Sequence, residues 1–130
     1  MSDLLNPVFI LTADECRSRI VALPDKIEAC DVLWDRCNAK PVYVGTARNK
    51  GRIRAHLLKD SVRDGKIGLT HRNRKFFDYV NSQPVGWLGV TFELFETKAK
   101  AREAERAAIS KFGIRRNGGS LFNRQMTGQP

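Results

Sequence analysis

Two short apolar segments separated by a turn place the strongest constraint on the fold of this 130-residue chain. The first covers residues 31–36 and is centred on a Val-Leu-Trp run, and the second covers residues 41–47. A short turn at Asn38 and Ala39 joins them, so the pattern predicts a β-hairpin. The chain therefore contains at least one antiparallel pair of strands.

The rest of the chain adds helices and one further strand. Thr12 and Glu15 fit a capping box, which predicts a helix from Ala13 to Val21. The other predicted elements are a helix over 51–63, a loop or short extended piece over 65–70, a helix over 72–81, a strand over 86–95 and a helix over 98–112 that ends at Gly113. This order predicts an α+β fold: a small, mostly antiparallel, three-stranded sheet flanked by helices, with an extra N-terminal helical segment.

Length and composition favour one soluble domain. Hydrophobic residues make up 42% and charged residues 28% of the chain. No apolar run approaches the roughly 20 residues that span a bilayer. The N-terminal apolar stretch is short and is followed by Asp14 and Glu15, unlike a signal peptide. We expect a cytoplasmic protein that does not contact a membrane.

The three cysteines, Cys16, Cys30 and Cys37, match no zinc knuckle or redox pair. A mixed zinc site that includes His56 and His71 is one interpretation of these residues. The other is that the cysteines are small buried or half-buried side chains.

The net charge of +9 is concentrated in one part of the chain. Residues 48–75 carry ten basic and two acidic side chains, whereas residues 1–47 carry five basic and seven acidic ones. We call residues 48–75 the basic segment. A phosphate backbone is the commonest partner for such a focused positive charge, and a solvated basic surface without a partner is the alternative.

Glu105 is the most informative single residue. At 100° per residue it lies 40° from both Ala101 and Ile109, inside the apolar stripe of the predicted last helix. A carboxylate turned toward the protein interior needs compensation by an arginine or by a bound divalent cation. Glu103 faces away on the same helix.

The predicted helix over 51–63 carries a basic stripe. Arg52, His56, Lys59 and Arg63 share one face of it, whereas Arg54 lies nearer the apolar side. Such a stripe is typical of a helix that lies on phosphates, and also of one that presents an arginine and a histidine for catalysis. Taken alone, His56 is equally an ordinary, partly exposed histidine.

Several motifs then occur in the order of a known family. The segment Pro41-Val42-Tyr43-Val44-Gly45-Thr46-Ala47 resembles the second half of the signature of GIY-YIG nucleases. Arg52 and His56 follow with an R-x-x-x-H-like spacing, Glu105 resembles the metal-binding glutamate, and Asn123 resembles the closing asparagine. The resemblance covers residues 29–124, preceded by an extension over 1–28 that packs on the domain and followed by a tail over 125–130.

The chain departs from this family in the first half of the signature. Residues 30–34 contain neither the glycine nor the tyrosine of the Gly-Ile-Tyr motif, and Trp34 falls where that tyrosine is expected. Trp34 has no ionisable hydroxyl and cannot replace it in proton transfer. His71 is a second family-like histidine, which we treat as peripheral.

The resemblance implies a metal-dependent endonuclease that hydrolyses phosphodiester bonds in double-stranded DNA. Glu105 would hold one Mg²⁺ or Mn²⁺, Tyr43 would position or deprotonate water with help from His56, and Arg52 would bind the scissile phosphate. Asn123 would orient the site, and we expect residues 43, 52, 56 and 105 to meet in one positively charged hollow. The residues expected to contact flanking DNA are Gly45, Lys59, Arg63, Arg72, Arg74 and Lys75.

Two other functions stay open at this point. One is a non-catalytic DNA-binding protein on the same scaffold, which the missing first tyrosine favours. The other is a basic protein-interaction module that binds an acidic partner. Cleavage specificity and oligomeric state do not follow from the sequence.

Overall fold

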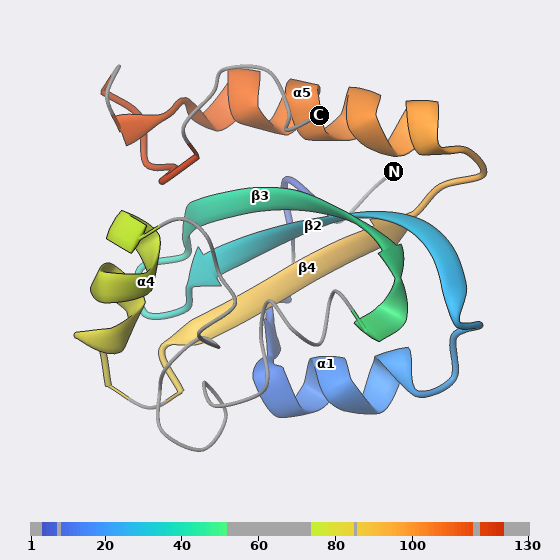
Figure 1. Cartoon of the computed structure of the whole chain (residues 1–130). Helices are drawn as coiled ribbons and strands as arrows, with labels where there is room; N and C mark the ends of the chain where they lie inside the picture. The colour runs from blue at the N-terminus through green and yellow to red at the C-terminus, as the bar shows by residue number, and fades with distance from the viewer. Residues whose placement is uncertain (1–3, 8, 52–73, 85, 116–117, 124–130) are drawn as a thin grey trace.

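A computed structural model of the chain describes residues 4–7, 9–51, 74–84, 86–115 and 118–123. Within these residues the chain forms one sheet and three helices (Figure 1). None of the helices that the structure describes could cross a bilayer. The elements are, in chain order, β1 (Leu11–Thr12), α1 (Ala13–Ile20), β2 (Lys26–Asp35), β3 (Lys40–Asn49), α4 (Arg74–Asn81), β4 (Leu88–Leu94) and α5 (Lys98–Phe112).

The α+β class is confirmed, but the described sheet has four strands rather than the predicted three. The strand order is β1-β4-β2-β3, and every neighbouring pair is antiparallel. The extra strand is β1, in which Leu11 pairs with Val90 and Thr12 with Gly89. The prediction missed β1 because two residues are too few to show the alternation that identifies a strand.

The predicted hairpin is confirmed, and its strands extend further from the turn than expected, to Lys26 and Asn49, although the first strand ends at Asp35, one residue earlier than predicted. In the turn, the Asp35 carboxylate accepts hydrogen bonds from the backbone N–H groups of Cys37 and Asn38, at 2.9 and 3.2 Å. Ala39 has a positive φ of 52° at the end of this turn. Side-chain hydrogen bonds of this kind let a short turn reverse the chain without extra residues.

Helix α1 begins at the predicted capping box. The Thr12 hydroxyl accepts a hydrogen bond from the Glu15 backbone, and the Glu15 carboxylate accepts one from the Thr12 backbone. The hydrogen bond from the Thr12 N–H also lowers the pKa of Glu15. Thr12 therefore ends β1 and caps α1, which turns the chain directly from the sheet into the helix.

The sheet separates two apolar layers (Figure 1). On one face, α1 and α4 pack through Cys16, Ile20, Phe76 and Val80. On the other, α5 packs through Ala108 and Ile109 against alternate residues of β2 and β3, namely Cys30, Val32, Trp34 and Val44. The central strand β2 is thus covered on both faces, which explains why all of its residues from Ala29 to Asp35 are buried.

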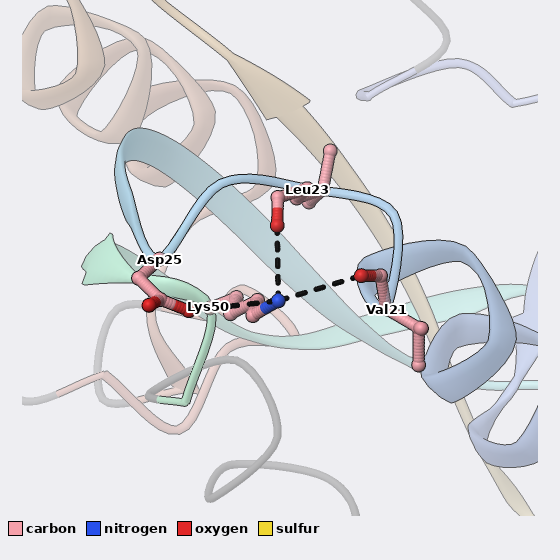
Figure 2. A network of polar contacts seen from close by, with 4 residues as sticks. All are labelled: Val21, Leu23, Asp25 and Lys50. Atoms are coloured by element: carbon pink, nitrogen blue, oxygen red, sulfur yellow. Dashed lines mark hydrogen bonds and ion pairs between the residues drawn. The ribbon is translucent and has the colours of Figure 1, made fainter.

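Lys50 ties the end of β3 to the connection between α1 and β2 (Figure 2). Its backbone N–H donates to the Asp25 carbonyl at 3.2 Å. Its ammonium group donates to the carbonyls of Leu23 and Val21, at 3.0 and 3.4 Å, and lies 3.6 Å from the Asp25 carboxylate. A cation beyond the last turn of a helix suits the carbonyls left without helical partners there.

Candidate active site

Tyr43 lies in the middle of β3, opposite Leu33 of β2. Its half-buried ring stacks on Phe76 of α4 with ring centroids 5.0 Å apart. Phe76 is also 5.6 Å from Phe122, measured between ring centroids. Aromatic contacts therefore hold Tyr43 on the face of the sheet that α1 and α4 cover.

Glu105 lies on the buried side of α5, as the helical periodicity predicts. Only 1% of its surface is exposed, and its buried neighbours along the helix are Ala101, Ala108 and Ile109. Burial raises the pKa of the Cys30 thiol, and the negative charges of Asp31, Glu105 and Glu93 raise it further. The Glu105 carboxylate therefore lies close enough to β2, beneath α5, for its charge to act on Cys30.

Tyr43 and Glu105 occupy opposite faces of the sheet. Tyr43 packs with Phe76, whereas Val44, the next residue along β3, packs with Ile109 of α5. Successive residues of a strand point to opposite faces, so α5 and the Tyr43 ring are separated by the sheet. The described residues do not bring the Tyr43 hydroxyl and the Glu105 carboxylate into one hollow.

Asn123 holds the outer edge of β3. Its side-chain oxygen accepts a hydrogen bond from the Val44 N–H at 2.9 Å, and its side-chain N–H donates to the Val44 carbonyl at 2.8 Å. The N–H of Phe122 donates to the Val42 carbonyl at 2.7 Å. The buried Asn123 amide therefore fixes the β3 backbone at Val44, between Tyr43 and Gly45.

Trp34, at the position of the missing tyrosine, belongs to the core under α5. Its indole N–H donates to the Thr91 hydroxyl at 2.9 Å, and its ring meets Phe112 edge-on with centroids 5.8 Å apart. Only 4% of Trp34 is exposed. This side chain packs the sheet against α5 and has no ionisable group that could take part in proton transfer.

Asp31 is a buried carboxylate that the sequence analysis did not single out. It is fully buried in the central strand β2, and its partner across the hairpin is Gly45. Burial and the charge of Asp31 raise the pKa of the Cys16 thiol on α1 to about 12. Leu33, two residues along β2, packs in the layer of α1 and α4, so the alternation of the strand places Asp31 on the Tyr43 side of the sheet. An acidic residue between the apolar residues Cys30 and Val32 is the sequence signal that identifies it.

Most of the predicted DNA contacts belong to the basic segment, much of which lies outside the described residues. This applies to Arg52, Arg54, His56, Lys59, Arg63, His71 and Arg72. Arg74 and Lys75 begin α4, but their side chains are not described. The site is therefore built from β3, α5 and the segment around Asn123.

Among the described residues, no three His, Cys, Asp or Glu side chains form a group that could hold a metal. Mg²⁺ commonly keeps several waters and binds through one or two carboxylates together with substrate phosphate. Glu105 offers one carboxylate, and Glu93 offers another opposite Cys30 on β4.

Cys16 and Cys30 are both buried but lie in the apolar layers on opposite faces of the sheet. They therefore do not share a metal ion. The third cysteine, Cys37, is exposed in the hairpin turn. The interpretation that the cysteines are buried or half-buried is confirmed for Cys16 and Cys30 and is wrong for Cys37.

Comparisons with protein-family models, with curated proteins and with solved structures found no match to this chain.

Proposed function

We propose that this chain is a DNA endonuclease that hydrolyses phosphodiester bonds with one divalent cation held by Glu105. The observation that carries the proposal is the convergence of three distant segments on β3. The Tyr-Val-Gly segment lies within β3, the helix of Glu105 packs on this strand through Val44, and Asn123 bonds the backbone N–H and carbonyl of Val44. The three segments thus meet at β3, although Tyr43 and Glu105 lie on opposite faces of the sheet.

Each residue has a distinct part in this proposal. Glu105 supplies a carboxylate oxygen on the buried side of α5, and Asn123 keeps β3 in place beside it. A bound Mg²⁺ or Mn²⁺ would stabilise the charge on the phosphate and on the leaving 3′-oxygen. Arg52 and His56 remain predictions for phosphate binding and proton transfer. Tyr43 lies on the face of the sheet opposite Glu105, so the proposal includes no direct contact between Tyr43 and the cation.

The test is plasmid nicking by purified protein with Mg²⁺, with Mn²⁺ and with excess EDTA. We expect cleavage with either metal and none with EDTA. Glu105→Gln keeps the size of the side chain but removes the charge, and should lower the nicking rate at least about 100-fold, because metal-ion stabilisation contributes several kcal/mol to the transition state. Glu103→Gln is the matched control, because Glu103 is exposed on the same helix.

Two results would overturn the proposal. One is full nicking activity in Glu105→Gln protein that is folded and binds DNA. The other is nicking that persists in EDTA, or that disappears equally in Glu103→Gln, because either would disconnect cleavage from the Glu105 carboxylate.

A non-catalytic DNA-binding protein is the second candidate. The separation of Tyr43 from Glu105 by the sheet favours it, as does the burial of Trp34 in the core. Such a protein should bind duplex DNA in a salt-dependent way and leave it intact with either metal. The same nicking and binding measurements therefore separate the two functions.

A further inference from the structure

Arg115 lies just beyond α5 and outside the motifs that resemble the nuclease family. Its backbone N–H donates to the Leu121 carbonyl at 2.8 Å, and its carbonyl accepts from the Gly118 N–H at 3.0 Å. The backbones of Gly113 and Gly119 approach each other so closely that a Cβ on Gly119 would lie 2.1 Å from the carbonyl carbon of Gly113. The main chain of Arg115 is therefore fixed on both sides.

The side chain of Arg115 is also held in place. Its guanidinium carbon lies 4.4 Å from the centroid of the Phe122 ring and 5.8 Å from that of Tyr79, while the residue as a whole is exposed. No carboxylate of the described residues forms an ion pair with it. A guanidinium that contacts an aromatic ring through a cation–π interaction does not use its N–H groups as hydrogen-bond donors in that contact, so they can bind other partners.

The rings under Arg115 belong to an aromatic cluster that we define as Tyr43, Phe76, Tyr79 and Phe122. The ring centroids of Tyr79 and Phe122 are 4.7 Å apart, and those of Tyr43 and Phe76 are 5.0 Å apart. Tyr79 and Phe76 lie on α4, the helix whose first residues end the basic segment. Helix α4 thus connects the end of the basic segment to the aromatic cluster that Arg115 contacts.

We propose that Arg115 binds a backbone phosphate of the DNA and extends the contact surface beyond the basic segment. The inference rests on the proposed function, since it takes DNA as the substrate. A fixed guanidinium with free edge N–H groups is suited to bidentate phosphate binding, and it loses little freedom when the phosphate arrives. The contact with the Phe122 ring fixes the position of the Arg115 guanidinium, and the guanidinium N–H groups then bind the phosphate.

The test measures the affinity for a short DNA duplex in EDTA over a range of salt concentrations. Arg115→Met keeps an apolar stem over the Phe122 ring and removes the charge. It should weaken binding several-fold and reduce the slope of log affinity against log salt by about 1. Arg115→Lys should keep the wild-type slope. Arg17→Met, which removes an exposed arginine on α1, is the matched control and should change neither quantity.

The outcomes separate this inference from the proposed function. If wild-type protein binds DNA and folded Arg115→Met shows the same affinity and slope, Arg115 is only a ring-stacking residue and the inference fails alone. If Arg115→Met and Arg115→Lys lose affinity equally with the slope unchanged, the role is structural and the inference also fails. If wild-type protein does not bind DNA, the proposed function fails together with the inference.

Discussion

Cys16 and Cys30 show how burial controls the chemistry of single side chains in this fold. Both thiols are fully buried, one on each face of the sheet, and both have a raised pKa. Burial is the largest cause, because a thiolate loses its hydration inside the protein, and the Asp31 charge adds to it in both cases. The thiol form is therefore the one that the folded state stabilises.

The stability of the protein should consequently fall in alkaline solution. A raised pKa means that the folded state holds the proton more tightly, so this contribution is complete below the ordinary value of 9.0 and is lost as the pH rises toward about 12 for Cys16. We expect the free energy of unfolding by urea to decrease between pH 8.5 and pH 10.5 by up to about 1.4 kcal/mol per pH unit for each thiol. Cys16→Ala should reduce that dependence.

Thiol labelling gives an independent check at neutral pH. Native protein should react quickly at the exposed Cys37 alone, while Cys16 and Cys30 react only after denaturation. Rapid labelling of all three thiols in native protein would contradict the burial described for the two core cysteines.

At the scale of elements, the sheet is held at its β3 edge by a segment from the far end of the chain. Asn123 provides one donor and one acceptor to the backbone of a single residue, Val44. The amide is buried, so water does not readily replace it after substitution. This edge therefore depends on a contact between residues that are 79 positions apart.

Asn123→Ala should lower the free energy of unfolding by about 2 kcal/mol, because it leaves the N–H and carbonyl of Val44 without these hydrogen bonds. Thermal and urea unfolding followed by circular dichroism would measure the change. Asn6→Ala, at an exposed position, serves as the control and should stay within about 0.5 kcal/mol of wild type. Equal midpoints for Asn123→Ala and wild type would show that the edge does not need this amide.

The elements also show which parts of the structure the sequence can predict. The capping box at Thr12 and the helix that ends at Gly113 were predicted because their signals are local. β1 was missed because its two residues gain their structure only by pairing with β4. The early start of β2, at Lys26, was missed because Lys, Glu and Ala are uncommon in strands, so these first residues give a weak strand signal.

The candidate site was predictable to a similar extent. The inward orientation of Glu105 follows from helical periodicity, which is a property of one segment. The separation of Tyr43 from Glu105 depends on which face of the sheet each helix covers, and this packing is not encoded by any single motif. Arg115 was missed for the same reason, since Tyr79, one of the rings it contacts, comes from another element.

At the scale of the whole molecule, the N-terminal residues are part of the domain rather than an addition to it. β1 extends the sheet, α1 contributes Cys16 and Ile20 to the apolar layer, and the carbonyls after α1 bind Lys50. The predicted boundary after residue 28 also falls within β2. Residues 29–124 therefore do not form a self-contained unit in this structure.

A protein that begins at residue 26 should consequently fail to fold cooperatively. It loses β1, α1 and the apolar surface they cover, which costs about 1.5–3 kcal/mol for each large core side chain. We expect no cooperative thermal transition, measured by near-ultraviolet circular dichroism. A sharp transition near that of the full chain would show that the first 25 residues are dispensable.

The two outer strands of the sheet also bear on how copies of this chain meet one another. On one side, Phe122 and Asn123 already occupy the backbone groups of Val42 and Val44. On the other, β1 offers only two residues. The backbone groups of Val42 and Val44 are therefore closed to a neighbouring molecule that would lengthen the sheet at β3, which is how exposed edge strands begin to aggregate.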